Sequence, residues 1–206
     1  MIPVVSSMER EVPPDPLELE LRALVAAGEV DRATERTVRT YGPELIAWLG
    51  SLLDSEADTH DAFSRWAEDL WRSLRRYDGR CSVRTWCYML ARCAVARVRA
   101  EPRRRREQLV SQVPSVAAAV GHAWSTTRAA EHHRRDVYAE IRRGLEEDDQ
   151  ILLVLRVDRE LSWRDIALVM LGADAAPDDI TRRAAALRKQ FERIKVRLRE
   201  LAARYP

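Results

Sequence analysis

Arginine side chains give this chain most of its capacity for chemistry. All of its 35 basic residues are arginine except Lys189 and Lys195. They concentrate in the stretch RCSVRTWCYMLARCAVARVRAEPRRRR at residues 80–106 and in residues 180–206, where nine bases face two acids. GC-rich coding would also favour arginine, but the planar guanidinium fork suits phosphate oxygens whatever its origin. The pattern therefore indicates electrostatic binding to phosphates, as in a nucleic acid.

No residue pattern indicates a catalytic site. The four histidines do not stand at metal-ligand spacings with carboxylates; they are His60, His122, His132 and His133. The chain has only seven glycines and no glycine-rich phosphate loop, and no serine or cysteine lies in a nucleophile motif. We therefore expect no catalytic residue, no metal and no cofactor, and the protein is predicted not to be an enzyme.

The cysteines and the apolar runs predict where the protein works. An odd number of cysteines, Cys81, Cys87 and Cys93, with no secretory signal indicates a reducing, cytoplasmic location. Because free cysteines are commonly buried, we expect three small packed thiols, and a redox response is a weaker hypothesis. No stretch approaches the roughly 18 apolar residues of a membrane span, so no membrane insertion is expected.

Apolar periodicity predicts an all-α fold of two small helical domains joined by a linker. Residues 1–30 are expected to form an N-terminal arm with room for a short helix that ends at Gly28. Residues 31–101 form the first domain, residues 102–130 a linker that can be partly helical, and residues 131–206 the second domain. No period-2 segment or hairpin turn predicts a strand.

Local signals set the helix ends of the first domain. We expect an N-cap at Asp31, a break or kink at residues 42–43, a stop at Gly79, a start at Ser82 and an end at Pro102. One apolar stripe consists of Ala62, Phe63, Trp66, Leu70 and Leu74. A second stripe consists of Trp86, Leu90, Cys93 and Ala94.

The second domain is predicted to be a helix-turn-helix unit preceded by helices over 130–150 and 151–160. Ser162 and Asp165 form a capping-box pattern at the start of the supporting helix. GADAAPDD at 172–179 predicts a turn, longer than is usual, and the last helix is expected from about Asp179 to Arg204. Its apolar stripe consists of Ile180, Ala184, Leu187, Phe191, Ile194, Leu198 and Leu201. Arg182, Lys189 and Arg193 fall on the opposite side, where a major-groove reader carries its bases.

Residues 32–204 together resemble a bacterial RNA polymerase sigma factor of the sigma-70 family, extracytoplasmic-function type. The pieces DAF and LWRSLRRYDG are similar to the family's region 2, and SVRTWCYMLAR is the most specific match. LSWRDIALVM and LRKQFERIKVRLREL resemble region 4. The resemblance implies two helical domains, core RNA polymerase and promoter DNA as partners, and an anti-sigma protein as a further partner.

The resemblance also implies roles for particular side chains. The core polymerase-binding candidates are Asp61, Ser64, Arg65 and Trp66. The candidates for the −10 element are Arg84, Thr85, Trp86, Arg92, Arg97 and Arg99. The candidates for the −35 element are Arg182, Arg188, Lys189 and Arg193, with Trp163 and Arg164 near phosphates.

The sequence departs from the family pattern at four positions. His60 stands where the family usually has Glu, Ser64 where it has Gln, Cys93 where it often has Asn, and Arg97 where it has Asp. These departures bear on polymerase docking and on −10 recognition and melting.

The predicted function is that of a sigma factor, which brings core polymerase to a subset of promoters. The first alternative is a stand-alone helix-turn-helix regulator, which would not need the acidic, Trp-bearing helix at 58–76. The second is a sigma-like helical adaptor or antagonist without promoter activity, which the departures favour.

Overall fold

The computed structural model describes residues 16–53, 55–101, 114–131 and 145–202. Every regular element in these ranges is helical and none is a strand, which confirms the all-α prediction for this part of the chain. The arginine run at 103–106 and most of the helix predicted over 130–150 lie outside the described residues.

Eight α-helices and two short helical turns make up the described chain. The first group is α1 (Pro16–Ala26), α2 (Val30–Leu52), α3 (Glu56–Ser73), the 3-10 turn η1 (Leu74–Arg76) and α4 (Val83–Ala100). The second group is α5 (Pro114–Glu131), α7 (Glu147–Leu153), the π-helical turn η3 (Val154–Asp158), α8 (Trp163–Leu171) and α9 (Pro177–Ala202). The short helix expected in the N-terminal arm is α1, and Gly28 follows it with a φ of 76°.

Serine hydroxyls start three of the helices. Ser55, Ser82 and Ser162 each accept a hydrogen bond from the backbone N–H three residues later, at 3.0, 3.0 and 3.1 Å. α4 has a second cap, because both carboxylate oxygens of Glu18 on α1 accept from the N–H of Val83, at 3.0 and 2.9 Å. The helix starts predicted at Ser82 and Ser162 are confirmed.

α2 runs without a break through the position where one was predicted. Pro43 lies inside the helix, and Gly42 is buried where α5 crosses. A Cβ on Gly42 would stand 2.9 Å from the Cβ of Ala123, so this glycine permits close packing rather than a kink. Asp31 is not the N-cap either: α2 begins one residue earlier, and the Asp31 carboxylate accepts from the indole N–H of Trp71 at 2.8 Å. Both predictions, the break at residues 42–43 and the N-cap at Asp31, were wrong because residues far along the chain, Ala123 and Trp71, contact these positions.

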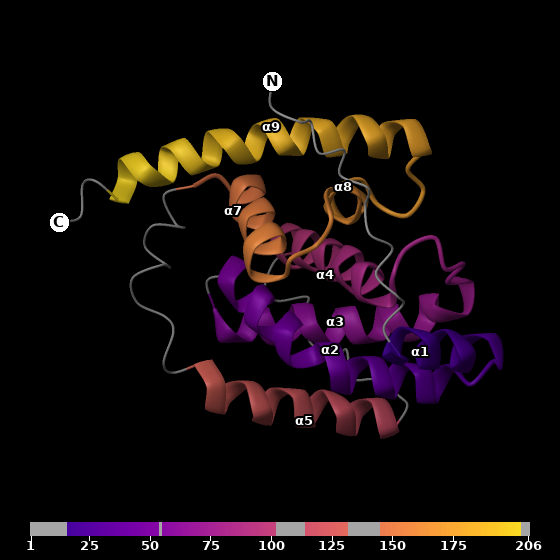
Figure 1. Cartoon of the computed structure of the whole chain (residues 1–206). Helices are drawn as coiled ribbons and strands as arrows, with labels where there is room; N and C mark the ends of the chain where they lie inside the picture. The colour runs from indigo at the N-terminus through magenta and orange to yellow at the C-terminus, as the bar shows by residue number, and fades with distance from the viewer. Residues whose placement is uncertain (1–15, 54, 102–113, 132–144, 203–206) are drawn as a thin grey trace.

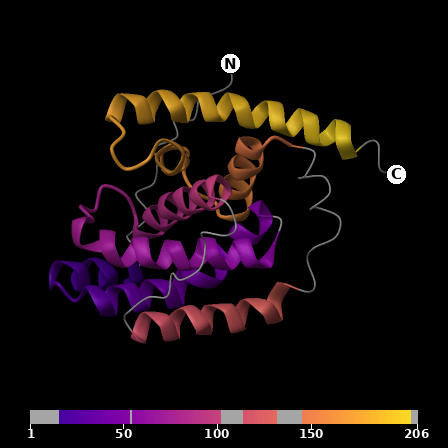
Figure 2. The same cartoon turned by 180° about the vertical axis from the view of Figure 1, so that it is seen from behind.

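The helices form layers around α2, α3 and α4. Figure 1 shows α5 along one side of these three helices, and α8 and α9 along the other. The view from behind in Figure 2 shows the same order, with α7 between α4 and α9. α4 therefore lies between the N-terminal bundle and the C-terminal helices.

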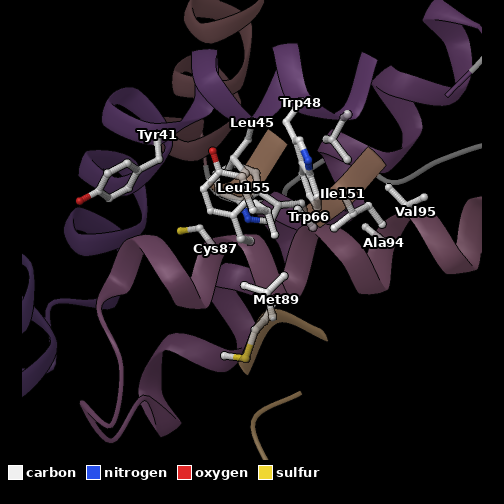
Figure 3. Packing of buried hydrophobic residues seen from close by; sticks show 14 of the residues in the cluster. Tyr41, Leu45, Trp48, Trp66, Cys87, Met89, Ala94, Val95, Ile151 and Leu155 are labelled. Carbon is white, nitrogen blue, oxygen red and sulfur yellow. The ribbon is translucent and has the colours of Figure 1, made fainter. Parts of the chain in front are cut away.

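One apolar cluster joins the two halves of the chain. Ile151 and Leu155, from α7 and η3, are 1% and 0% exposed and belong to the same cluster as Trp48, Trp66 and Val95 (Figure 3). The division into two domains and a linker stays a prediction, and α5 occupies part of the range predicted as linker.

The two apolar stripes predicted for the first domain have different outcomes. All five residues predicted on the α3 stripe are buried, which confirms it. On α4 the prediction holds in part: Ala94 is buried, Trp86 and Leu90 are half-buried against the core, and only Cys93 is exposed. The buried side of α4 instead consists of Val83, Thr85, Cys87, Tyr88, Met89, Ala91, Ala94, Val95 and Val98. α4 buries a wider face than one stripe because it is packed by α3 on one side and by α8 on another.

The expectation of three packed thiols holds for one cysteine fully and for one in part. Cys87 is fully buried, Cys81 is half-buried and Cys93 is exposed. Burial raises the pKa of the Cys81 thiol to about 12 and raises that of Cys87 as well. Cys93 faces solvent because it lies outside the face of α4 that is buried in the described chain.

Candidate nucleic-acid interface

α8 and α9 are two helices joined by a turn, in the order that the sequence predicts. The Ser162 hydroxyl accepts from the N–H of Asp165 and donates to its carboxylate at 2.6 Å, which fixes the first turn of α8. α8 ends at Leu171 and is capped by Gly172, whose φ is 95°, and α9 begins at Pro177. The turn is therefore shorter than predicted, because Pro177 suits the first position of a helix and starts α9 two residues earlier.

The apolar stripe of α9 holds the helix against the molecule. Ile180, Ala184, Leu187 and Ile194 are buried, whereas Phe191 and Leu198 are half-buried. The side chain of Leu201 lies outside the described residues. The stripe is confirmed over its described length, and it fixes which side of α9 faces solvent.

The opposite side of α9 presents basic side chains to solvent. Arg182, Arg188, Lys189 and Arg193 are all exposed. Arg182 pairs with Asp179 at 2.5 Å, but within the described chain the other three make no ion pair. Three cations on one side of a well-packed helix can bind phosphate or the acceptor edges of guanine without first breaking a protein contact.

Trp163 and Arg164, predicted to lie near phosphates, are placed differently from one another. The Trp163 ring packs edge-on against Phe191 of α9 with centroids 5.5 Å apart, and the guanidinium of Arg156 lies 4.8 Å from its centroid. Trp163 therefore attaches α8 to α9. Arg164 is exposed and stays available.

The arginines of α4 lie in a different setting, which begins with Arg84. Its guanidinium donates to both carboxylate oxygens of Glu44 on α2, at 2.9 and 3.1 Å, and to the carbonyl of Arg159 at 3.0 Å. Tyr88 also donates to Glu44, at 3.1 Å, and burial raises its pKa, so the phenol keeps its proton. Burial opposes the charge on Arg84, but the hydrogen bonds and charge of Glu44 outweigh it and raise the pKa of Arg84.

Arg92 and Arg99 are held from the C-terminal side as well. Arg92 donates to the carbonyl of Met170, at the end of α8, at 3.0 Å and lies 3.7 Å from the carboxylate of Asp148. Arg99 forms an ion pair with Glu147 and donates to the carbonyl of Leu52 at 2.6 Å.

The remaining −10 candidates also have partners within the chain. Arg97 is exposed but pairs with Asp69, and the hydrogen bonds to that carboxylate raise its pKa. The Trp86 indole donates to Ser73 at 3.3 Å. Thr85 is fully buried, so in this arrangement it cannot touch DNA. Among the six candidates for the −10 element, the prediction is therefore wrong for Thr85. The other five lie at or near the surface, and their polar groups form hydrogen bonds or ion pairs within the chain.

The polymerase-binding candidates divide between surface and core. Asp61 and Ser64 are half-buried, on the outer side of α3. Arg65 is 8% exposed and donates to both oxygens of Glu101 at 3.1 and 2.6 Å. Trp66 is fully buried. Arg65 and Trp66 thus hold α3 to its neighbours in this arrangement, and only Asp61 and Ser64 among the four candidates are accessible to a partner.

Sequence reasoning missed the acids that face the α4 arginines. They are Glu44 on α2, Asp69 on α3, and Glu147 and Asp148 on α7. These carboxylates are up to 56 residues from their partners, so no local spacing could have revealed them. The acidic run EEDD at 146–149, two to five residues before the very apolar segment that begins at Ile151, is the one signal visible in the sequence.

Two further searches concern only the described residues. Among them, no three histidine, cysteine or acidic side chains gather in a way that could hold a metal ion. No helix in the same ranges has the length and apolar character needed to cross a membrane.

Comparisons of the chain with protein-family models, with curated proteins and with solved structures found no match.

Proposed function

We propose that this protein is a sigma factor, which binds core RNA polymerase and directs it to a subset of promoters. One observation carries the proposal: α9 is anchored by its apolar stripe and presents Arg188, Lys189 and Arg193 outward from a capped helix-turn-helix unit. That arrangement suits an α-helix entering the major groove of duplex DNA. The basic side of α9 by itself supports DNA binding in general, and the resemblance of residues 32–204 to sigma factors favours the more specific function of a sigma factor.

Each surface has a task under this proposal. α9 reads the −35 element, and phosphate contacts from Arg164 and Arg182 fix its register. α4 meets the −10 element, and Asp61 and Ser64 dock on polymerase. The protein supplies recognition and no catalytic step, it acts in the cytoplasm, and an anti-sigma protein is its expected inhibitor.

A stand-alone helix-turn-helix regulator is the second candidate. The observation that favours it is the contrast between α9, whose bases are open, and α4, whose arginines are engaged. A sigma-like adaptor without promoter activity would also keep Trp66 as a core residue.

Size-exclusion chromatography of the protein with core RNA polymerase tests the proposal. We expect a stable complex that Asp61→Arg weakens, because Asp61 lies at the surface of α3. Glu20→Arg on α1, an exposed acid of the same charge, is the matched control and should leave the complex intact. Duplex DNA binding without any polymerase complex would favour the stand-alone regulator, and loss of both activities would favour the adaptor.

A further inference from the structure

Two aromatic rings join α8 to α9 in a directional contact. The rings of Trp163 on α8 and Phe191 on α9 meet edge to face, with centroids 5.5 Å apart and planes inclined by 69°. Both side chains are half-buried against the core, so the pair lies between the apolar stripe of α9 and solvent. Aromatic pairs prefer this geometry because the positive edge of one ring faces the negative face of the other. The contact therefore depends on orientation as well as on distance.

A cation stands at each end of the ring pair. The guanidinium of Arg156, on η3, lies 4.8 Å from the centroid of Trp163, and the ammonium of Lys195 lies 5.6 Å from the centroid of Phe191. Arg156 is itself held, because it donates to the carbonyl of Leu161 at 2.8 Å. Cations are attracted to the negative face of an aromatic ring. Arg156, Trp163, Phe191 and Lys195 thus form an aromatic ladder that runs from η3 through α8 to α9.

The apolar stripe alone does not fix how α9 is rotated about its axis. The fully described buried members of the stripe are all aliphatic: Ile180, Ala184, Leu187 and Ile194. The hydrophobic effect that holds them is non-directional. An apolar stripe spans about 100° of the helix surface, so a rotation of about 20° would leave the same side buried.

A rotation of that size would matter on the opposite side of α9. Side-chain ends lie about 5–6 Å from the axis of an α-helix, so a rotation of about 20° moves them by about 2 Å. The N–H···O distances of hydrogen bonds span only about 0.5 Å. Arg188 and Lys189 therefore need a fixed rotation to reach the same base edges. A contact to phosphate tolerates the shift better, because it depends mainly on charge.

Two other side-chain contacts also hold α9 within the C-terminal helices. Gln190 donates to the carboxylate of Asp149 on α7 at 2.7 Å, and Arg183 donates to the sulfur of Met170 at 3.7 Å. Both contacts come from long side chains that can follow a turning helix by changing rotamer. Aromatic side chains have few rotatable bonds and act as rigid anchors. The ladder is therefore better suited to set the rotation of α9.

We infer that Trp163 is a positioning residue for the reading of duplex DNA by α9. Through the aromatic ladder it fixes the rotation of α9, and with it the base edges that Arg188 and Lys189 reach. This inference rests on the proposed function, because it takes α9 to read base sequence. The ladder then contributes to discrimination between sequences more than to affinity, since α9 keeps its exposed cations without it.

The test compares Trp163→Leu with Trp163→Phe in the full chain. Leucine keeps an apolar side chain but removes the ring, whereas phenylalanine keeps a ring for Phe191 and Arg156 to contact. The matched control is Trp124→Leu. Trp124 is also half-buried and meets Phe63 edge to face, with centroids 6.0 Å apart. It lies on α5, on the other side of the molecule from α9 (Figure 1).

The measurement is sequence discrimination. Selection from a duplex library with a randomised segment gives the sequence that the parent protein prefers, and fluorescence anisotropy gives each dissociation constant for that duplex and for a scrambled one. We expect Trp163→Leu to lower the ratio of the two constants roughly tenfold, as the loss of one base contact does. Its constant for the scrambled duplex should stay within about twofold, with the same salt slope, because the phosphate contacts remain. Trp163→Phe and Trp124→Leu should keep the ratio of the parent.

Phe191→Leu tests the ladder from its other side. It should lower the discrimination ratio by about the same factor as Trp163→Leu. The double variant Trp163→Leu/Phe191→Leu should lose no more than either single variant, because both changes remove one shared contact. Fully additive losses would contradict a shared role.

Three further results would overturn the inference, and they differ for the proposed function. If Trp163→Leu keeps the parent's ratio, or Trp163→Phe loses it as well, the ring pair does not set the reading of sequence, and the polymerase assay still decides the proposed function. If Trp163→Leu weakens binding to both duplexes equally and lowers the melting temperature, the ring serves folding alone. If the parent protein itself enriches no sequence, α9 reads no base edges, and its −35 role falls as well.

Discussion

α4 and α9 are both long helices rich in arginine, yet their charges stand in opposite settings. On α9, Arg188, Lys189 and Arg193 face solvent, whereas on α4 the guanidinium groups of Arg84 and Arg92 are occupied by carboxylates and carbonyls. The cause is position: α9 lies at the edge of the molecule and α4 between two sets of helices (Figure 1). A basic helix is a binding surface only when the surrounding fold leaves its cations without closer acceptors.

Thiol chemistry should give the largest difference between the two sides of α4. Cys93 lies on the open side and Cys87 is fully buried. We expect Cys93 to react about a thousandfold faster, since an opening that costs about 4 kcal/mol leaves that fraction of Cys87 accessible. Cys81 should also be slow at pH 8, because its pKa of about 12 keeps it protonated. Kinetics with a thiol-specific disulfide reagent, with the fast site identified by mass spectrometry, check this.

The control is Cys93→Ser, which should remove the fast phase. If Cys87 and Cys93 react at the same rate in the native protein, Cys87 is not buried in the way that the structure shows.

Leu155→Ala tests how strongly the C-terminal half is joined to the bundle around α4. Leu155 is fully buried in the shared cluster, so we expect a loss of about 2–5 kcal/mol in the free energy of unfolding. Val157→Ala, at a site 53% exposed in the same turn, should change it by about 0.5 kcal/mol or less. Guanidinium denaturation measures both. Equal, small losses in the two variants would mean that the halves are not joined through this cluster.

Duplex DNA binding separates the two helices directly. Arg188→Ala/Lys189→Ala should weaken binding roughly tenfold or more and reduce the salt slope by about two, one unit for each lost phosphate contact. Arg92→Ala/Arg99→Ala on α4 removes the same charge and should change duplex affinity by no more than about twofold, since these groups are engaged within the chain. Anisotropy titrations at several salt concentrations supply both numbers. An equal loss in the two double variants would erase the contrast between α4 and α9.

The smallest effect concerns the helix that supports α9. Ser162→Ala removes the N-cap of α8 and should lower the free energy of unfolding by about 1 kcal/mol. Ser162→Asn keeps a capping oxygen and should stay within a few tenths of the parent. Thermal denaturation distinguishes them, and equal losses would show that the cap does not stabilise α8.

The predictions that came true depend on neighbours in the sequence. The caps at Ser82 and Ser162 involve residues three positions on, and the stripe of α9 follows from helix period alone. Where one side of a helix is buried and the other faces solvent, the spacing of apolar residues in the sequence predicts which side is which.

The predictions that failed depend on residues far along the chain. Pro43 stays within α2 where Gly42 lets α5 approach, and α4 is packed by more than one neighbour, so a single apolar stripe could not describe it. Arg65 and Trp66 are predicted on a docking surface because a family resemblance shows which residues match a motif, but it does not show that their side chains are buried. The carboxylates of Glu44 and Glu147 become visible only once the helices are assembled.

Transcription by core RNA polymerase on fragmented genomic DNA, with and without this protein, tests the sigma-factor proposal most directly. Mapping the 5′ ends of the RNA is the measurement. The account predicts new start sites that share common upstream elements and that are lost with Arg188→Ala/Lys189→Ala. An unchanged set of start sites, with the protein folded and able to bind duplex DNA, would contradict it.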